Sequence, residues 1–323
     1  MNRTLVVAAL STLISGAALA QSSVTVYGRL NMTLESQDMN GTNVKKENNN
    51  SSRIGFKGSE DLGGGLKAGF VLESGMSPDT GAAGSPFWGR QSEVNLSGGF
   101  GTVRLGRFTS EAYFATADYI SMHNHDTGTS EDALYGYVGR NTNKVAYRAP
   151  EFVKGLSIEG AVSAAEGVVG QTRSYDFAGN YSLGDLHIGL GYEKNGTAKQ
   201  MALSGFYQLG SILLGGYVQR DTNAWGSGDR TSFRLSGAYM LGASEFHLNV
   251  GKAGKTSNVA NSAATQFTAA YNYNLSKRTK VYAYYTEVKD GAANLYNSGN
   301  FGVTATGRDT KFGSLAVGVR HNF

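Results

Sequence analysis

The sequence predicts an all-β fold, a closed 16-stranded antiparallel transmembrane β-barrel. Three observations lead to this prediction. Apolar and polar residues alternate over many short segments, the connections between these segments alternate between short and long, and only 40% of the 323 residues are hydrophobic. A barrel strand needs apolar residues on its outer face alone, so its hydrophobic signal is weaker than that of a membrane helix.

The first 20 residues are expected to form a cleaved signal peptide. Arg3 supplies a short basic region, residues 5–14 are mostly apolar, and Ala18-Leu19-Ala20 forms a small-residue cleavage site. The apolar run is too short for a membrane helix, which needs about 20 residues to cross ~30 Å of hydrocarbon. We therefore expect a mature chain of residues 21–323 that is exported from the cytoplasm.

The mature chain then follows a period of two. Val24, Leu30 and Leu34 share one face of the first segment, whereas Arg29 and Glu35 share the other. Successive side chains of a strand point to opposite faces, so this segment has one apolar and one polar face. The same alternation recurs along the chain and divides it into sixteen strands. They are expected to begin near residues 24, 52, 66, 89, 101, 142, 156, 174, 186, 199, 212, 231, 243, 265, 279 and 310.

The connections support a barrel in an outer membrane. Short connections are expected at 60–65, 98–100, 183–185, 209–211 and 276–278, and long polar ones at 36–51, 75–88, 109–141, 222–230, 254–264 and 290–309. Short periplasmic turns, long extracellular loops and an even number of strands are typical of such barrels. The sheet must close, because an open edge would leave unpaired backbone groups in hydrocarbon. Sixteen strands enclose an aqueous channel.

Composition argues against several other classes of protein. There is no cysteine, the formal net charge is +4, and no run of basic residues suggests a nucleic-acid partner. His123, His125 and Asp126 are a weak metal signal, because a zinc site needs further ligands. We expect no cofactor, metal or catalytic site. A secreted β-sandwich and a barrel-embedded hydrolase remain as alternatives, although no G-x-S-x-G motif is present.

Several motifs resemble the general porins of β-proteobacteria, the trimeric family that includes the neisserial and Omp32-like porins. The most specific is SRIGFKGSEDLGGGLKA at 52–68, and GFGTVRLGR at 99–107 and the terminal VGVRHNF also match. The resemblance implies passive diffusion of ions and small hydrophilic solutes through a homotrimer in the bacterial outer membrane. It also implies contact with outer-membrane lipid and lipopolysaccharide, and recognition of Phe323 by the barrel-assembly machinery.

The 33-residue connection 109–141 is the longest and is expected to narrow the channel. Long connections are usually functional, although a mobile extracellular loop is the alternative. In the resembling family, the third long loop folds inward and its carboxylates face arginines on the barrel wall. The carboxylates of this loop are Glu111, Asp118, Asp126, Glu131 and Asp132.

Five cations are expected on the facing wall. Alternation places Arg29, Arg53 and Lys57 on lumen faces, since a lipid-facing arginine at the bilayer midplane would cost ~2–4 kcal/mol. The resemblance adds Arg90 and Arg140 to this group.

The facing of these last two arginines stays open. Arg90 shares parity with the lipid-facing Val94 and Leu96, so it requires either a β-bulge or a position at the rim. Arg140 stands at the end of the loop.

Wall cations opposite loop carboxylates would create a transverse field that biases ion passage. We expect a weak anion preference, because the wall arginines, which stay charged at any working pH, should dominate over the loop acids. A substrate-specific channel is the alternative. It would bind its solute on aromatic residues of the loop such as Tyr113, Phe114, Tyr119, Tyr135 and Tyr137, although packing of the loop explains these side chains equally well.

Overall fold

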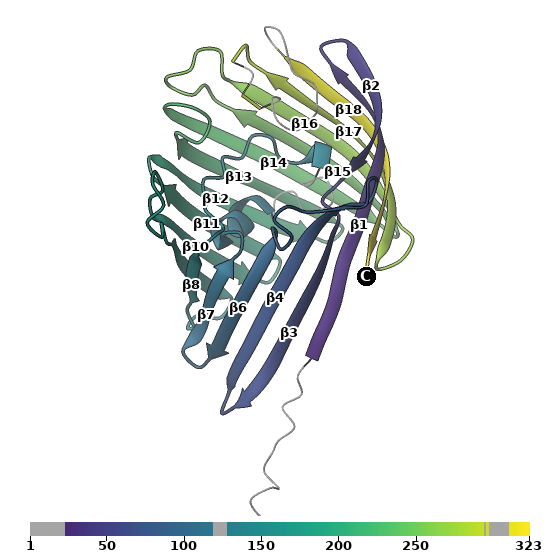
Figure 1. The fold of residues 1–323 in the computed structure, drawn as a ribbon. Helices are drawn as coiled ribbons and strands as arrows, with labels where there is room; N and C mark the ends of the chain where they lie inside the picture. Colours follow the sequence, from purple (N-terminus) through teal and green to yellow (C-terminus); the bar gives the residue numbers. More distant parts are fainter. Residues whose placement is uncertain (1–22, 119–127, 294, 297–309) are drawn as a thin grey trace, which may run out of the picture.

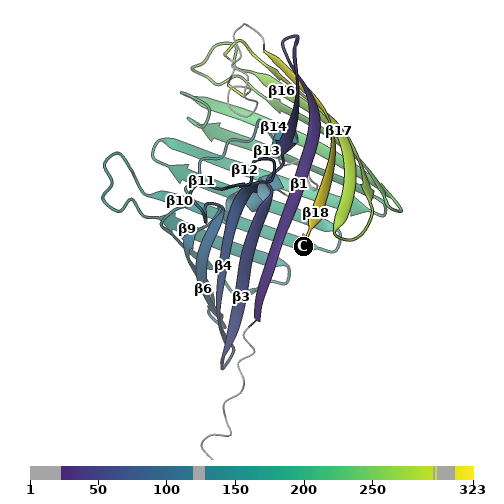
Figure 2. The same cartoon turned by 45° about the vertical axis from the view of Figure 1, so that its right-hand side comes forward.

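The computed structural model describes residues 23–118, 128–293, 295, 296 and 310–323. The expected signal peptide, residues 1–20, lies outside the described residues. The described chain forms one antiparallel sheet that closes into a barrel (Figures 1 and 2). None of the helices described is both long enough and apolar enough to span a membrane.

Sixteen strands make up the barrel, as predicted. They are β1 (Ser23–Met39), β3 (Arg53–Gly63), β4 (Leu66–Ser77), β6 (Gln91–Gly98), β7 (Gly101–Arg107), β8 (Lys144–Arg148), β9 (Leu156–Ser163), β10 (Ser174–Leu183), β11 (Leu186–Asn195), β12 (Ala198–Leu209), β13 (Ile212–Thr222), β14 (Asp229–Leu241), β15 (Ser244–Ala253), β16 (Ala264–Asn274), β17 (Thr279–Asp290) and β18 (Lys311–Asn322).

The first and last strands close the barrel. β1 pairs with β18 from Arg29 opposite Asn322 to Met39 opposite Phe312. The ladder continues beyond β18, because the backbone groups of Gly28 and Phe323 exchange two hydrogen bonds of 3.0 and 3.1 Å. No strand edge is left for lipid at this seam, which is what a bilayer requires.

The two faces of each strand differ as the alternation predicts. On β13, Leu214 and Val218 are 54% and 48% exposed. Gln219, which follows Val218 and points to the opposite, inner face, is fully buried. The exposed apolar residues form the outer surface, which can contact hydrocarbon, and the polar residues point inward. The predicted pattern of an apolar exterior and a polar interior is confirmed.

Short turns join the strands at one end of the barrel. Gly63, Gly64 and Gly65, between β3 and β4, all have positive φ, a conformation that glycine adopts without steric cost. The described chain begins and ends at this same end (Figure 1). The strand ends that the long connections join lie at the opposite end.

The connection 36–51 differs from the predicted polar loop. β1 continues to Met39, and a further strand, β2 (Thr42–Asn49), returns beside it. Asn40 and Gly41 form the turn with φ of 51° and 87°, a known signal for a tight hairpin. The period of two did not reveal β2 because all of its residues except Val44 are polar. The loop 75–88 likewise contains a two-residue strand, β5 (Ala82–Ala83), paired with β4.

The third long connection folds into the barrel, as expected. It contains α2 (Glu111–Tyr113), the π-helix η1 (Phe114–Asp118) and the 3-10 helix η3 (Gly128–Ser130). These short helices contact the inner faces of β10, β11 and β12 and reach β2 and β17 on the far side. The loop therefore crosses the lumen.

Candidate pore constriction

The third loop packs against the wall through small residues. Gly189 and Gly191 occupy inward positions of β11, and Ala112 and Ala115 of the loop are fully buried against them. A Cβ atom on Gly191 would lie 2.7 Å from the Ala112 carbonyl oxygen, closer than such contacts allow. Glycine at these positions lets the loop backbone approach the wall.

Amide side chains from the wall then fix the course of the loop. The Gln219 amide accepts from the Gly136 N–H at 2.7 Å and donates to the Gly136 carbonyl at 3.0 Å. Gln266 accepts from the Ala133 N–H at 3.0 Å and donates to the Glu131 carbonyl at 2.7 Å. The loop backbone needs these partners because it runs away from any strand that could pair with it.

Glu111 joins a chain of alternating charges on the wall. Its carboxylate accepts from the Arg148 guanidinium at 2.8 Å, and Arg148 also reaches Glu159 at 2.9 Å. Arg104 continues the chain by bridging Glu159 at 2.9 Å and Glu93 at 2.8 Å. Glu111 therefore shares the cation of Arg148 with Glu159.

Burial influences the pKa of the Glu111 carboxyl more than the charge of Arg148 does. Desolvation raises the pKa of the Glu111 carboxyl, and the attraction of Arg148 lowers it less than burial raises it. Glu111 therefore protonates at a higher pH than an ordinary glutamate.

Asp132 is also paired within the lumen. Its carboxylate accepts from the Tyr217 hydroxyl at 2.5 Å and lies 3.0 Å from Nε of Arg234, whose side chain is 1% exposed. Tyr217 and Arg234 belong to β13 and β14. This contact ties the second half of the loop to the wall, and it neutralises another loop carboxylate.

The remaining loop acids differ in their surroundings. Asp118 is exposed on η1. Glu131 borders a cavity beside Asp132. Asp126 lies outside the described residues, as do His123, His125 and Tyr119. Among the residues described, no three His, Cys, Asp or Glu side chains gather as a metal site would require.

Four of the five predicted wall cations lie on, or directly beside, the neighbouring strands β1, β3 and β4. Nε of Arg90 lies 2.5 Å from a Glu73 carboxylate oxygen, and Nε of Arg53 lies 3.9 Å from the same oxygen. Arg29 is directly opposite Arg53 in the register of β1 and β3. The Lys57 ammonium sits 5.3 Å from the centre of the Tyr27 ring. We call Arg29, Arg53, Lys57 and Arg90 the wall cluster.

The position of Arg90 explains why its parity does not determine the direction of its side chain. Arg90 precedes β6, and its N–H donates to the Glu73 carbonyl at 3.2 Å. It lies outside the regular strand, so the alternation of Val94 and Leu96 does not fix its direction. Its side chain reaches the inward-facing Glu73.

Arg140 is separate from the wall cluster. Its guanidinium donates to the Ala164 carbonyl at 3.2 Å and to the Asn195 side chain at 3.3 Å, beside the long-loop ends of β9 and β11.

Sequence reasoning missed further cations beside Arg29. Nε of Arg29 and Nε of Arg320 both donate to the Asn322 side-chain oxygen, at 3.3 and 3.4 Å. Lys280 lies nearby on β17, with its ammonium 3.3 Å from Glu245. Arg320 alternates with the lipid-facing valines of β18, so the period of two could have identified it.

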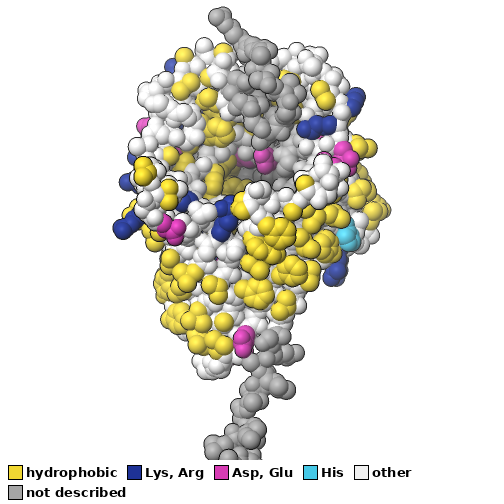
Figure 3. All heavy atoms as spheres, viewed as in Figure 1, with side chains coloured by type: hydrophobic (Ala, Val, Ile, Leu, Met, Phe, Trp, Pro, Cys, Tyr) yellow, Lys and Arg dark blue, Asp and Glu magenta, His cyan; other side chains and the backbone are white. Residues whose placement is uncertain are grey.

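The wall cluster and the third loop face each other. β3 and β4 lie half-way around the sheet from β12 and β13, against which the loop packs. Between them the lumen opens to the exterior, and Figure 3 shows this hollow with acidic side chains inside it.

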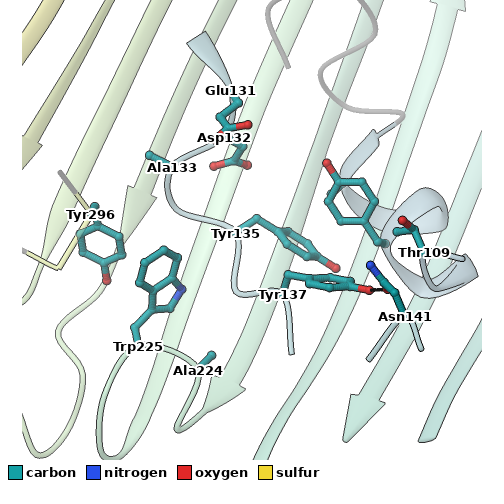
Figure 4. A pocket seen from close by; sticks show the side chains of 12 residues that line it. Thr109, Glu131, Asp132, Ala133, Tyr135, Tyr137, Asn141, Ala224, Trp225 and Tyr296 are labelled. Carbon is teal, nitrogen blue, oxygen red and sulfur yellow. Dashed lines mark hydrogen bonds between the residues drawn. The ribbon is translucent and has the colours of Figure 1, made fainter. Parts of the chain in front are cut away.

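The aromatic residues of the loop mostly pack it in place. Tyr113 contacts Tyr135 and Tyr137 edge to face, with ring centroids 5.8 and 5.7 Å apart. Tyr135 also packs on the wall residue Tyr217, and its hydroxyl accepts from Gln200 at 3.2 Å. These rings border a cavity of about 500 Å³, which also has Trp225 and Tyr296 on its wall (Figure 4).

Two outer-membrane porins are similar in sequence to almost the whole of this chain. The chain is 32% identical to outer membrane porin protein 32 of Delftia acidovorans, with 96% of each chain covered. It is 28% identical to an outer membrane porin protein of Bordetella pertussis over the full length of both.

Solved structures show the same fold. The anion-selective porin from Comamonas acidovorans superposes with a TM-score of 0.75 at 26% identity, covering 94% of this chain and 100% of that one. OmpF of Salmonella typhi superposes with a TM-score of 0.71, but at 15% identity it supports the fold alone.

These relatives confirm the predicted outer-membrane location and the prediction of a channel instead of an enzyme. The family model for Gram-negative porins matches residues 4–294. With its closed sixteen-stranded barrel and inward-folded third loop, the chain belongs to the Gram-negative porin family.

Proposed function

We propose that this porin passes ions and small hydrophilic solutes by diffusion, with a weak preference for anions. One observation carries the proposal. Two loop carboxylates, Glu111 and Asp132, are already paired with wall arginines, whereas Arg53 and Arg90 share the single carboxylate of Glu73. Positive charge is therefore in excess on the cluster side of the lumen.

This arrangement supports selectivity without tight binding. Cations on one wall and carboxylates on the other give a field across the narrow part of the channel, which biases the ions that pass. Guanidinium groups keep their charge at any working pH. The Comamonas acidovorans porin, 26% identical, is described as anion-selective, which agrees with the proposal.

Reversal potentials in planar bilayers test the proposal. Under a potassium chloride gradient, the porin should favour chloride. In the double variant Arg53→Ala and Arg90→Ala, the preference should fall towards neutrality and conductance should rise, because the lumen loses two cations and the volume of their side chains.

Lys154→Ala provides the charge control, because Lys154 is exposed in the short turn between β8 and β9. It should leave selectivity unchanged. A wild-type preference for potassium, or an unchanged preference in the double variant, would contradict the proposal.

We further propose a homotrimer of mature chains beginning at Gln21. The family resemblance supports the trimer, and a trimeric form is recorded for Vibrio cholerae OmpT, a protein of the same fold. Phe323 would serve as the signal for the barrel-assembly machinery, and its ring is 40% exposed on the outer face over Gly28. Migration as a heat-sensitive trimer in detergent gels, and three equal conductance steps per insertion, would support this assembly.

A further inference from the structure

A cavity of about 500 Å³ lies beside the third loop and is open to solvent on one side. Its size falls within the range of small-molecule sites, roughly 300–1,000 Å³. Its walls carry aromatic side chains from three connections that are distant in sequence. We call it the aromatic cavity, after Tyr113, Tyr135 and Tyr137 of the third loop, Trp225 between β13 and β14, and Tyr296 between β17 and β18.

The tyrosine rings of the aromatic cavity are held by partners within the protein. The Tyr296 hydroxyl accepts from the Arg230 guanidinium at 2.9 Å, and this guanidinium lies 5.4 Å from the ring centres of both Trp225 and Tyr296. The Tyr137 hydroxyl donates to the side-chain oxygen of Asn141 (Figure 4). A solute that enters the cavity therefore meets rings that are already fixed, which lowers the entropic cost of binding.

Trp225 differs from the tyrosines because its polar atom has no such partner. The indole Nε1 atom is buried and has no hydrogen-bond acceptor among the residues described. Figure 4 shows this nitrogen pointing away from Tyr296 and towards the interior of the cavity. A buried donor without an acceptor is energetically costly. An acceptor atom on a solute in the cavity would remove that cost.

The charges around the aromatic cavity indicate a solute without net charge. The described residues that line it include the carboxylates of Glu131 and Asp132 and no lysine or arginine, so an anion would meet repulsion. Asp132 is paired with Arg234 at 3.0 Å, and Arg230 with Asp221 at 2.6 Å. An organic cation would leave the indole N–H unmatched, because a cation of that kind offers no acceptor.

We propose that the aromatic cavity binds a neutral pyranose sugar of monosaccharide or disaccharide size. The C–H face of the sugar ring would lie on Trp225, and its hydroxyls would accept from the Trp225 indole and from the Asn141 amide nitrogen, which also points into the cavity (Figure 4). Other hydroxyls would donate to Glu131. Aromatic rings together with a few placed donors and acceptors are the usual composition of such sites.

This inference rests on the proposed diffusion of small hydrophilic solutes through the lumen, and it names one class of them. The interaction should be weak, with a dissociation constant on the order of millimolar, because a solute that crosses a channel must also leave its site.

Tryptophan fluorescence of the porin in detergent tests the site, because the chain contains only two tryptophans. Trp88 packs against Phe56 and Phe87, with ring centroids 6.1 and 4.6 Å apart, and is not among the residues that line the cavity. The variant Trp88→Phe therefore leaves Trp225 as the only indole. Titration of this variant with glucose or lactose should change its emission in a saturable way, and calorimetry on the wild type should give the same dissociation constant.

The same substitution at the two tryptophans separates the cavity from the rest of the molecule. Trp225→Phe keeps an aromatic ring but loses the N–H donor, so it should weaken sugar binding about fivefold, the effect of one neutral hydrogen bond. Trp225→Ala should weaken it further, because the ring is also lost. Trp88→Phe is the matched control and should bind as the wild type does. Heat-dependent mobility in detergent gels checks that each variant is folded.

Two further probes test the class of solute. Sorbitol has the hydroxyls of glucose without the ring and should bind at least tenfold more weakly, and benzyltrimethylammonium should not compete with glucose. Sorbitol binding as tight as that of glucose, competition by the ammonium ion, an unchanged affinity in Trp225→Phe, or the absence of saturable binding would each overturn the proposal.

The outcome can be distinguished from that of the proposed anion preference. Calorimetry of sugar binding does not involve the passage of ions, whereas the reversal potential does. Sugar binding that depends on Trp225 in a channel without anion preference would contradict the proposed selectivity alone. A chloride preference without saturable sugar binding would contradict this inference alone.

Discussion

At the scale of single residues, the lumen is organised by pairing of charges that would otherwise be costly to bury. The Arg234 and Asp132 side chains are 1% and 10% exposed, and each is the partner of the other. Removing one member of such a pair leaves the other charge uncompensated, which is strongly destabilising. Asp132 therefore holds the loop to the wall.

Glu111 gives a pH-dependent prediction. Burial raises the pKa of its carboxyl, so Glu111 should take up a proton at a higher pH than an ordinary glutamate as the pH is lowered. The lumen then loses a negative charge, and the reversal potential should shift towards chloride. Planar-bilayer recordings at a series of pH values measure this shift.

The same raised pKa has a consequence for stability. The folded state binds the proton more tightly than the unfolded chain, so the contribution of Glu111 to stability is largest at low pH and decreases as the pH rises through the folded pKa.

The variant Glu111→Gln is the control for selectivity, and it should remove the pH dependence of the reversal potential. A shift of equal size in this variant would assign the titration to another group.

At the scale of elements, the third loop packs closely against β11 because two residues on the inner face of this strand are glycines. Gly189 and Gly191 leave room where α2 and η1 approach the wall. The hydrogen bonds from Gln219 and Gln266 then hold the second half of the loop. The width of the channel depends on this fit, because the loop backbone occupies the lumen.

Replacing Gly191 tests the fit. Gly191→Val should push α2 from the wall, reduce single-channel conductance and lower stability by about 1–3 kcal/mol through overpacking. Conductance and the temperature of the gel-mobility shift are the measurements. Gly179→Ala is the control, since a Cβ there meets no atom within 4 Å. Unchanged conductance in Gly191→Val would show that the loop is not held as described.

The strands themselves were largely predictable, and the hairpin of β1 and β2 was not. Predicted starts at 66, 101, 156 and 174 coincide with those of β4, β7, β9 and β10. The period of two identifies these strands because one face of each strand contacts lipid and the other faces the water-filled lumen. It fails for β2, whose Lys45, Lys46 and Glu47 are polar whichever face they occupy.

At the scale of the whole molecule, closure determines whether the barrel exists in a membrane. β18 pairs with both β1 and β17, so it joins the two ends of the sheet. Its loss would expose two rows of backbone groups to hydrocarbon, each group costing several kcal/mol.

A truncation after Thr310 should therefore not fold in lipid vesicles, as judged by the absence of a protease-resistant, heat-modifiable species. Phe323→Ala keeps the β18 ladder and should fold in vesicles, while accumulating poorly in the outer membrane of cells. Folding of the truncated chain would contradict the role of β18, and normal accumulation of Phe323→Ala would remove Phe323 as the assembly signal.

The sequence by itself determined the barrel, the sixteen strands, the direction of the regular strand residues and the existence of a long loop after β7. These properties follow from local alternation and from the rule that no backbone group stays unpaired in lipid. Only the tertiary structure decided that Arg90 reaches Glu73, that Arg140 lies apart, and that Arg148 and Arg234 are the partners of the loop acids. Those contacts join residues distant in sequence, and their geometry depends on barrel closure and on the course of a loop that has no periodic pattern.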